Sequence, residues 1–146
     1  MTKDNQFLKL TVQNDLKSLT EISEFIRSNM TGMGICHDKI AEVQIAVDEA
    51  FTNIIQHSRP IYNNRNAGSI EITCLKSREN FQIKIKNYGE PFDPISAEIN
   101  PDLTTDLIER KVGGLGIHFI KNLLDDLKYE YFEPGGYEVL TMVKVV

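Results

Sequence analysis

The chain has 146 residues, a formal net charge of −5, 41% hydrophobic residues and 25% charged residues. This balance is typical of one globular domain, which we expect to span residues 1–146. The acidic charge argues against a nucleic-acid partner, and no apolar run approaches the roughly 18–20 residues that cross a membrane.

The first elements predicted along the chain are a strand and a helix. Phe7–Val12 has the composition of a short strand, and Asn14 or Asp15 can cap the helix that follows. Apolar residues then recur at helical spacing from Leu16 to Met30. The glycine at position 32 indicates the end of this helix.

The central element is a long helix over Ile40–His57, for which Asp38 is the expected cap. Its apolar residues recur at three- and four-residue steps, which indicates one buried face. Glu49, Asn53 and His57 follow one another at four-residue steps, about 6 Å each, and form a polar ladder. A solvated helix face would have a similar composition, so the ladder alone leaves that alternative open.

Two antiparallel strands are predicted next, after a polar loop over 58–68. Ser69–Lys76 and Phe81–Lys86 each place alternate apolar residues on one face, as a half-buried hairpin does. Cys74 is in phase with that face. Because Cys36 and Cys74 lack metal-type spacing and the N-terminus lacks a secretion signal, we expect reduced thiols in a cytoplasmic protein.

The remainder of the chain predicts a long excursion, a helix and a second hairpin. The excursion, Ile95–Val112, is the expected lid over a functional site. A helix over Leu115–Leu124 and a hairpin of Leu127–Phe132 with Tyr137–Val145 complete the chain. We therefore expect an α/β fold, a two-layer sandwich of one mixed, mostly antiparallel sheet with helices on one face.

Two glycine-containing turns could hold a ligand. Gly113, Gly114 and Gly116 precede a helix, where backbone N–H groups and partial positive charge suit a phosphate. A tight turn is the plainer alternative, and the spacing is not that of a Walker A motif. At the end of a strand, Asn87 can read the edge of a base and Gly89 leaves room for a flat ring, but Asn-x-Gly is usually only a turn.

The polar ladder of the central helix could carry chemistry. Mg²⁺ takes one or two protein ligands and completes its shell with phosphates and water, so Asn53 could be its ligand. Glu49, one turn earlier, could take a proton from an attacking hydroxyl or water. His57 is more typical of a residue that interacts with the dipole at a helix C-terminus.

Three segments together resemble the GHKL ATPase superfamily. The segment DEAFTNIIQH resembles its N box, KNYGEPFDP its G1 box and VGGLGIHFIKNLLDD its G2 box, in the same order and at matching spacing. Their form is most similar to that of the anti-sigma factor serine/threonine kinases. The resemblance covers roughly Phe7 to Val145 and implies a Bergerat ATP-binding fold.

The resemblance also implies an activity and its parts. A kinase of this family uses ATP and Mg²⁺ to phosphorylate a serine or threonine of an anti-anti-sigma (STAS-type) protein, sequesters a sigma factor, and commonly forms a homodimer. Glu49 is then the general base, Asn53 holds Mg²⁺, and Arg110 or Lys111 is expected near the γ-phosphate. The expected ATP-binding residues are Asn53, His57, Asn87, Gly89, Phe92, Arg110, Lys111, Gly113, Gly114, Leu115, Gly116 and Ile117.

One position departs from the family pattern. The G1 box normally begins with an aspartate that accepts a hydrogen bond from the adenine amino group, and this chain has Asn87. A neutral acceptor loses on the order of 1 kcal/mol, or about tenfold in affinity. An alternative is therefore a nucleotide-binding or nucleotide-free regulatory module without robust kinase activity. The catalytic half of a histidine kinase is disfavoured, because no phosphoacceptor hairpin fits before Phe7.

Overall fold

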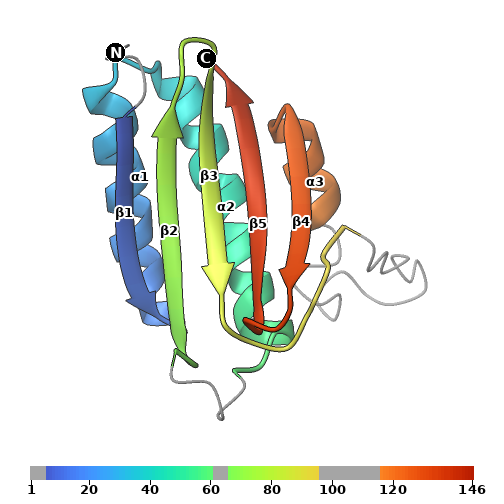
Figure 1. The fold of residues 1–146 in the computed structure, drawn as a ribbon. Helices are drawn as coiled ribbons and strands as arrows, with labels where there is room; N and C mark the ends of the chain where they lie inside the picture. The colour runs from blue at the N-terminus through green and yellow to red at the C-terminus, as the bar shows by residue number, and fades with distance from the viewer. Residues whose placement is uncertain (1–5, 61–65, 96–115) are drawn as a thin grey trace, which may run out of the picture.

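The computed structural model describes residues 6–60, 66–95 and 116–146, with the backbone alone for Gln6, Phe7 and 116–119. Five strands form one sheet in the order β1-β2-β3-β5-β4, and the α-helices of the described residues lie on one face of it (Figure 1). The strands are β1 (Gln6–Gln13), β2 (Ser69–Lys76), β3 (Asn80–Asn87), β4 (Asp126–Phe132) and β5 (Tyr137–Val145). The helices are α1 (Leu19–Gly32), α2 (His37–His57) and α3 (Gly116–Leu123), and a 3₁₀ turn (Leu16–Ser18) precedes α1. The expected two-layer α/β sandwich is confirmed.

The sheet is antiparallel at every pairing of the described strands, whereas the sequence predicts a mixed, mostly antiparallel sheet. Hairpins connect β2 to β3 and β4 to β5, and β5 lies between β3 and β4. The register of β3 with β5 places Asn87 opposite Glu138 and Asn80 opposite Val145. Two residues far apart in sequence, Asn87 and Glu138, are thereby brought together at one end of the sheet.

The core lies between the helices and one face of the sheet. Alternate residues of β2, β3 and β5 are buried there, which is the two-residue period of a strand covered on one side. The large side chains that are fully buried include Ile22, Ile26, Met30, Phe51, Ile72, Ile83 and Met142. None of the helices in the described residues is long and apolar enough to span a bilayer.

The central helix α2 begins earlier than the sequence predicts. It starts at His37 after an extended Cys36, and no side chain caps it. Asp38 lies in the first turn, so its predicted role as the cap is wrong. A carboxylate there still interacts favourably with the helix dipole. Asp15 does act as a cap, because its carboxylate accepts a hydrogen bond from the Lys17 N–H at 2.9 Å in the 3₁₀ turn.

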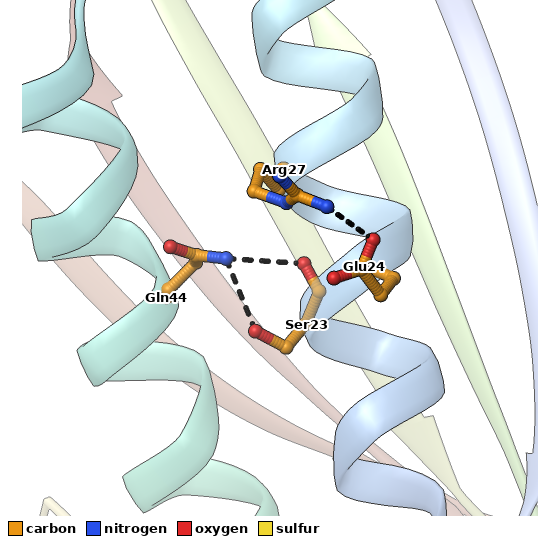
Figure 2. A network of polar contacts seen from close by, with 4 residues as sticks. All are labelled: Ser23, Glu24, Arg27 and Gln44. Atoms are coloured by element: carbon orange, nitrogen blue, oxygen red, sulfur yellow. Dashed lines mark hydrogen bonds and ion pairs between the residues drawn. The ribbon is translucent and has the colours of Figure 1, made fainter.

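Polar contacts hold α2 on both flanks. Figure 2 shows the contact with α1, where Gln44 Nε2 donates to the Ser23 carbonyl at 3.2 Å and to the Ser23 hydroxyl at 3.0 Å. On the other side, Lys144 of β5 forms an ion pair with Glu42 of α2. The helix that carries the predicted ladder is therefore fixed against both neighbours.

Both cysteines are free thiols, as predicted. Cys74 lies on the core face of β2, and burial raises the pKa of its thiol to about 12. Cys36 is exposed at the start of α2.

Candidate functional site

Polar residues from three elements meet at one end of the sheet. Asn53 comes from the last turns of α2, Asn87 from the end of β3 and Glu138 from the start of β5. Their side chains are buried, with exposed fractions of 3%, 0% and 3%. Such residues are seldom buried unless they are paired or serve a ligand. This end of the sheet is therefore the candidate site.

The polar ladder predicted on α2 contributes to this site. Glu49 Oε1 and Asn53 Nδ2 are buried and have no hydrogen-bond partner among the described residues. Burial raises the pKa of the Glu49 carboxyl above its ordinary value. The neighbouring Asp48 likewise has an unpaired Oδ1 and a pKa raised by burial. A solvated helix face does not account for these atoms, because an unpaired buried polar atom costs about 1–3 kcal/mol.

A small cavity lies beside Asn53. Its volume is about 10 Å³, which is room for about one water molecule. Its polar lining comes from Asn53, Tyr129 and Glu138, and Phe92 is part of its apolar lining. The cavity thus joins α2, the sheet and the segment after β3.

Asn87 is held by hydrogen bonds to two neighbours. Its Nδ2 donates to Ser58 Oγ at 2.7 Å and to Glu138 Oε1 at 3.1 Å. Ser58 in turn donates its hydroxyl hydrogen to the Glu90 carbonyl at 2.6 Å. The Asn87 Oδ1 is buried and has no partner in the part of the chain that the structure describes. The residue predicted to read a base therefore retains one unpaired acceptor.

Glu138 is a site residue that the sequence predictions miss. Its Oε2 accepts hydrogen bonds from the Phe92 N–H at 2.9 Å and from the Tyr129 hydroxyl at 2.5 Å. Burial and this contact with Glu138 raise the pKa of the Tyr129 hydroxyl. The sequence does carry a signal, because Glu138 is in phase with the buried Leu140 and Met142 along β5. A carboxylate at a core position of a strand indicates a partner or a ligand.

Gly89 is required by the close approach of two backbone segments. It forms an isolated β-bridge with Pro60. A Cβ added at Gly89 would lie 2.9 Å from the Arg59 carbonyl oxygen, from Asn87 Nδ2 and from Ser58 Oγ. Protein atoms occupy the side on which that Cβ would stand. The predicted space for a flat ring is therefore restricted to the other side of this backbone.

His57 contacts the segment that follows β3. Its ring stacks on the ring of Phe92, with centroids 4.6 Å apart and planes inclined by 20°. Because His57 is the last residue of α2, this position also suits the predicted interaction with the helix dipole. The stack connects the end of α2 to the wall of the small cavity.

The glycine-rich part of the predicted site lies largely outside the described residues. The predicted site residues outside the described part of the chain are Arg110, Lys111, Gly113, Gly114 and Leu115. All of the expected lid except Ile95 also lies outside it. Gly116 is the first residue of α3, and Ile117 follows it in that helix. The helix predicted after the glycines is thus confirmed.

Comparisons with known proteins identify the family of this chain and its fold. The family model described as the histidine kinase-like ATPase domain matches residues 12–144. The chain is 29% identical over 140 residues to the serine-protein kinase RsbW of Listeria monocytogenes, an alignment that covers 91% of this chain and 85% of that protein.

Two solved structures share the fold. One contains the RsbU and RsbW domains of a Mycobacterium tuberculosis protein, with a TM-score of 0.65, 13% identity, and coverage of 96% of this chain and 32% of that chain. The other is the SiaB–SiaC complex of Pseudomonas aeruginosa, with a TM-score of 0.61, 16% identity, and coverage of 95% and 89%.

The family match extends over most of the chain, and the relatives are named as protein kinases. The resemblance to anti-sigma factor serine/threonine kinases is confirmed, and so is the expected class of enzyme. The chain belongs to the histidine kinase-like ATPase domain family.

Proposed function

We propose that this chain is an anti-sigma regulatory kinase that binds Mg·ATP between α2 and the adjoining ends of β3 and β5. It transfers the γ-phosphoryl group to a serine or threonine of a STAS-type anti-anti-sigma protein. When that protein does not oppose it, the kinase, as a homodimer, sequesters a sigma factor. The family match and the kinase relatives support phosphotransfer, and the three sequence boxes support this choice of partners.

The observation that carries the proposal is a set of unpaired polar atoms at one end of the sheet. They are Glu49 Oε1, Asn53 Nδ2 and Asn87 Oδ1. A nucleotide offers matching groups, because phosphate oxygens accept from an amide N–H and the adenine amino group donates to a carbonyl oxygen. A bound nucleotide would therefore remove the cost of leaving these buried atoms unpaired.

The amide of Asn53 fits a magnesium ion that is held mainly by its nucleotide. Mg²⁺ in such sites takes one or two protein oxygens and completes its shell with phosphates and water. Asn53 is buried beside the small cavity, and its Nδ2 is not engaged by any described residue. Asn53 Oδ1 would be the ligand, and the ion would supply charge neutralisation at the phosphates.

Glu49 is the proposed general base. It lies one helical turn before Asn53, about 6 Å along the axis, and its Oε1 is unpaired. As the partner's hydroxyl oxygen bonds to the γ-phosphorus, the bond from that phosphorus to ADP breaks and Glu49 takes the hydroxyl proton. The raised pKa of Glu49 makes its carboxylate a better proton acceptor.

Transfer of labelled phosphate from ATP to a purified STAS-type protein of the same genome tests this proposal. We expect Glu49→Gln to keep nucleotide binding and to lower transfer by about 10²–10⁴-fold. The matched control is Asp48→Asn, which changes the adjacent carboxyl about 100° around the helix and is expected to retain transfer.

Undiminished transfer in Glu49→Gln, or an equal loss in both variants, would overturn the role of Glu49. Calorimetry with Mg·ATP separates the kinase from a nucleotide-free regulatory module. Absence of heat at millimolar nucleotide would favour the module.

A further inference from the structure

We propose that Glu138 is a positioning residue that, together with Ser58, fixes the amide of Asn87 so that Oδ1 is presented to the nucleotide base. This inference rests on the proposed function, because it concerns the base of the nucleotide bound there. The fixed orientation of the Asn87 amide makes the site select a base that carries an amino group over a base that carries a carbonyl at the same position.

The orientation of an asparagine amide is decided by its neighbours. The oxygen and the nitrogen have nearly the same size, so rotating the group by half a turn exchanges an acceptor for a donor at little steric cost. An asparagine reads a ligand selectively only where other groups hold one of the two orientations. At Asn87 the side chain is fully buried, and its hydrogen-bond partners can be identified.

Both neighbours of Asn87 Nδ2 act as acceptors. The Ser58 hydroxyl hydrogen is committed to the Glu90 carbonyl at 2.6 Å, which leaves Ser58 Oγ to accept. Asn87 Nδ2 donates its other hydrogen bond to Oε1 of the Glu138 carboxylate, which can only accept. Rotation of the amide would place Oδ1 against two acceptor oxygens and leave both without a donor, which is unfavourable in a buried site.

Glu138 is itself held in place. Its Oε2 accepts from the Phe92 N–H at 2.9 Å and from the Tyr129 hydroxyl at 2.5 Å. The carboxyl cannot turn away from Asn87 without leaving these two donors unpaired. The strand β5 thus imposes the orientation of a side chain on β3, through a contact between residues 51 positions apart.

The consequence is a fixed acceptor at the unpaired Asn87 Oδ1. The amino group of adenine can donate to this oxygen. Hypoxanthine has a carbonyl oxygen in place of that amino group, so its nucleotide would set two acceptors against each other. Comparison of Mg·ATP with Mg·ITP therefore measures the orientation of this amide directly.

Titration calorimetry of the whole chain with Mg·ATP and with Mg·ITP tests the inference. We expect the wild type to bind ATP at least about tenfold more tightly than ITP. In Glu138→Gln the new amide turns its oxygen towards the Phe92 and Tyr129 donors and its NH₂ group towards Asn87. The Asn87 amide then rotates, and we expect the preference for ATP to fall at least about fivefold.

The matched control is Tyr129→Phe, which removes one donor to Glu138 and leaves the contact with Asn87 intact. It is expected to change both affinities together and to keep their ratio. Thermal denaturation establishes that each variant is folded. Should Glu138→Gln not fold, Glu138→Met, which removes the acceptor beside Asn87 Nδ2, provides the same test of the ratio.

Two outcomes would overturn the inference, and they are distinguishable. An ATP-to-ITP ratio that is unchanged in the folded Glu138→Gln or Glu138→Met variant removes the role of Glu138 and leaves the proposed function standing. Absence of binding of either nucleotide to the wild type removes the proposed function and this inference with it.

Discussion

The ring of His57 lies on the ring of Phe92, with centroids 4.6 Å apart and an interplanar angle of 20°. This contact joins the last residue of α2 to the segment that follows β3. The same segment is tied to the sheet by the hydrogen bond from the Phe92 N–H to Glu138. One short stretch of chain thus connects the proposed catalytic helix to the proposed base-reading residues.

Replacing Phe92 by alanine is expected to loosen this connection. Loss of a stacked ring pair and of the buried part of the ring should lower the free energy of unfolding by about 1–3 kcal/mol. Urea denaturation measures this change, and a double-mutant cycle with His57→Ala isolates the stack itself. Phe92→Tyr keeps the ring and serves as the control. A Phe92→Ala chain as stable as the wild type would contradict this interpretation.

The carboxyls of Asp48 and Glu49 predict a pH-dependent cost in stability. Burial raises both pKa values, so the folded chain binds protons that the unfolded chain has already released. The free energy of unfolding therefore falls as the pH rises from the ordinary carboxyl pKa through the raised values, and the cost is complete once both carboxyls are ionised in the folded chain.

We therefore expect Asp48→Asn to melt at a higher temperature than the wild type at neutral pH. Well below pH 3.8, where the carboxyl is protonated in both states, this advantage should disappear. Melting temperatures across a pH series measure the effect. A variant that is less stable than the wild type at neutral pH would show that the charged carboxylate has a favourable partner.

Gly89→Ala tests the close approach of Gly89 to Ser58 and Arg59. The added Cβ would stand 2.9 Å from a backbone oxygen, which cannot move aside as a flexible side chain can. We expect a loss of about 1–3 kcal/mol in the free energy of unfolding, together with weaker nucleotide binding. The control is Gly32→Ala near the end of α1, where an added Cβ meets nothing within 4 Å. Equal stability of the two variants would contradict the packing argument.

The substitution of asparagine at position 87 is best understood together with Glu138. Asn87→Asp alone would set two carboxylates about 3 Å apart, which disfavours ionisation of both. We expect that variant to bind Mg·ATP more weakly and to be less stable than the wild type. The double variant Asn87→Asp with Glu138→Gln moves the charge back to β3 and should recover both properties. Tighter binding by Asn87→Asp alone would contradict this coupling.

Much of the fold follows from local patterns in the sequence. The three- and four-residue spacing over 40–57 predicts α2, and alternation predicts the strands around Cys74 and Ile83. The start of α2 is not predictable in the same way, because an extended Cys36 without a capping side chain precedes it.

The site is predictable only where its residues belong to sequence boxes. Glu49, Asn53 and Asn87 lie in such boxes. Their relation to Glu138 depends on the β3–β5 register, which no local pattern specifies. The role of Ser58 depends on the bridge between Pro60 and Gly89, a contact between a loop and the end of a strand.

The strand registers place the start of β1 and the finish of β5 at one end of the sheet and the candidate site at the other. Gln6 pairs with Lys76 and Asn80 pairs with Val145, so β1 starts and β5 finishes at the same end of the sheet (Figure 1). Asn87 and Glu138 lie at the opposite end, about 25 Å away along an eight-residue strand. A fluorescent reporter or an immobilising tether fused after β5, at the C-terminus, would therefore leave the approach of nucleotide unobstructed, which suits the chain to surface-based binding assays.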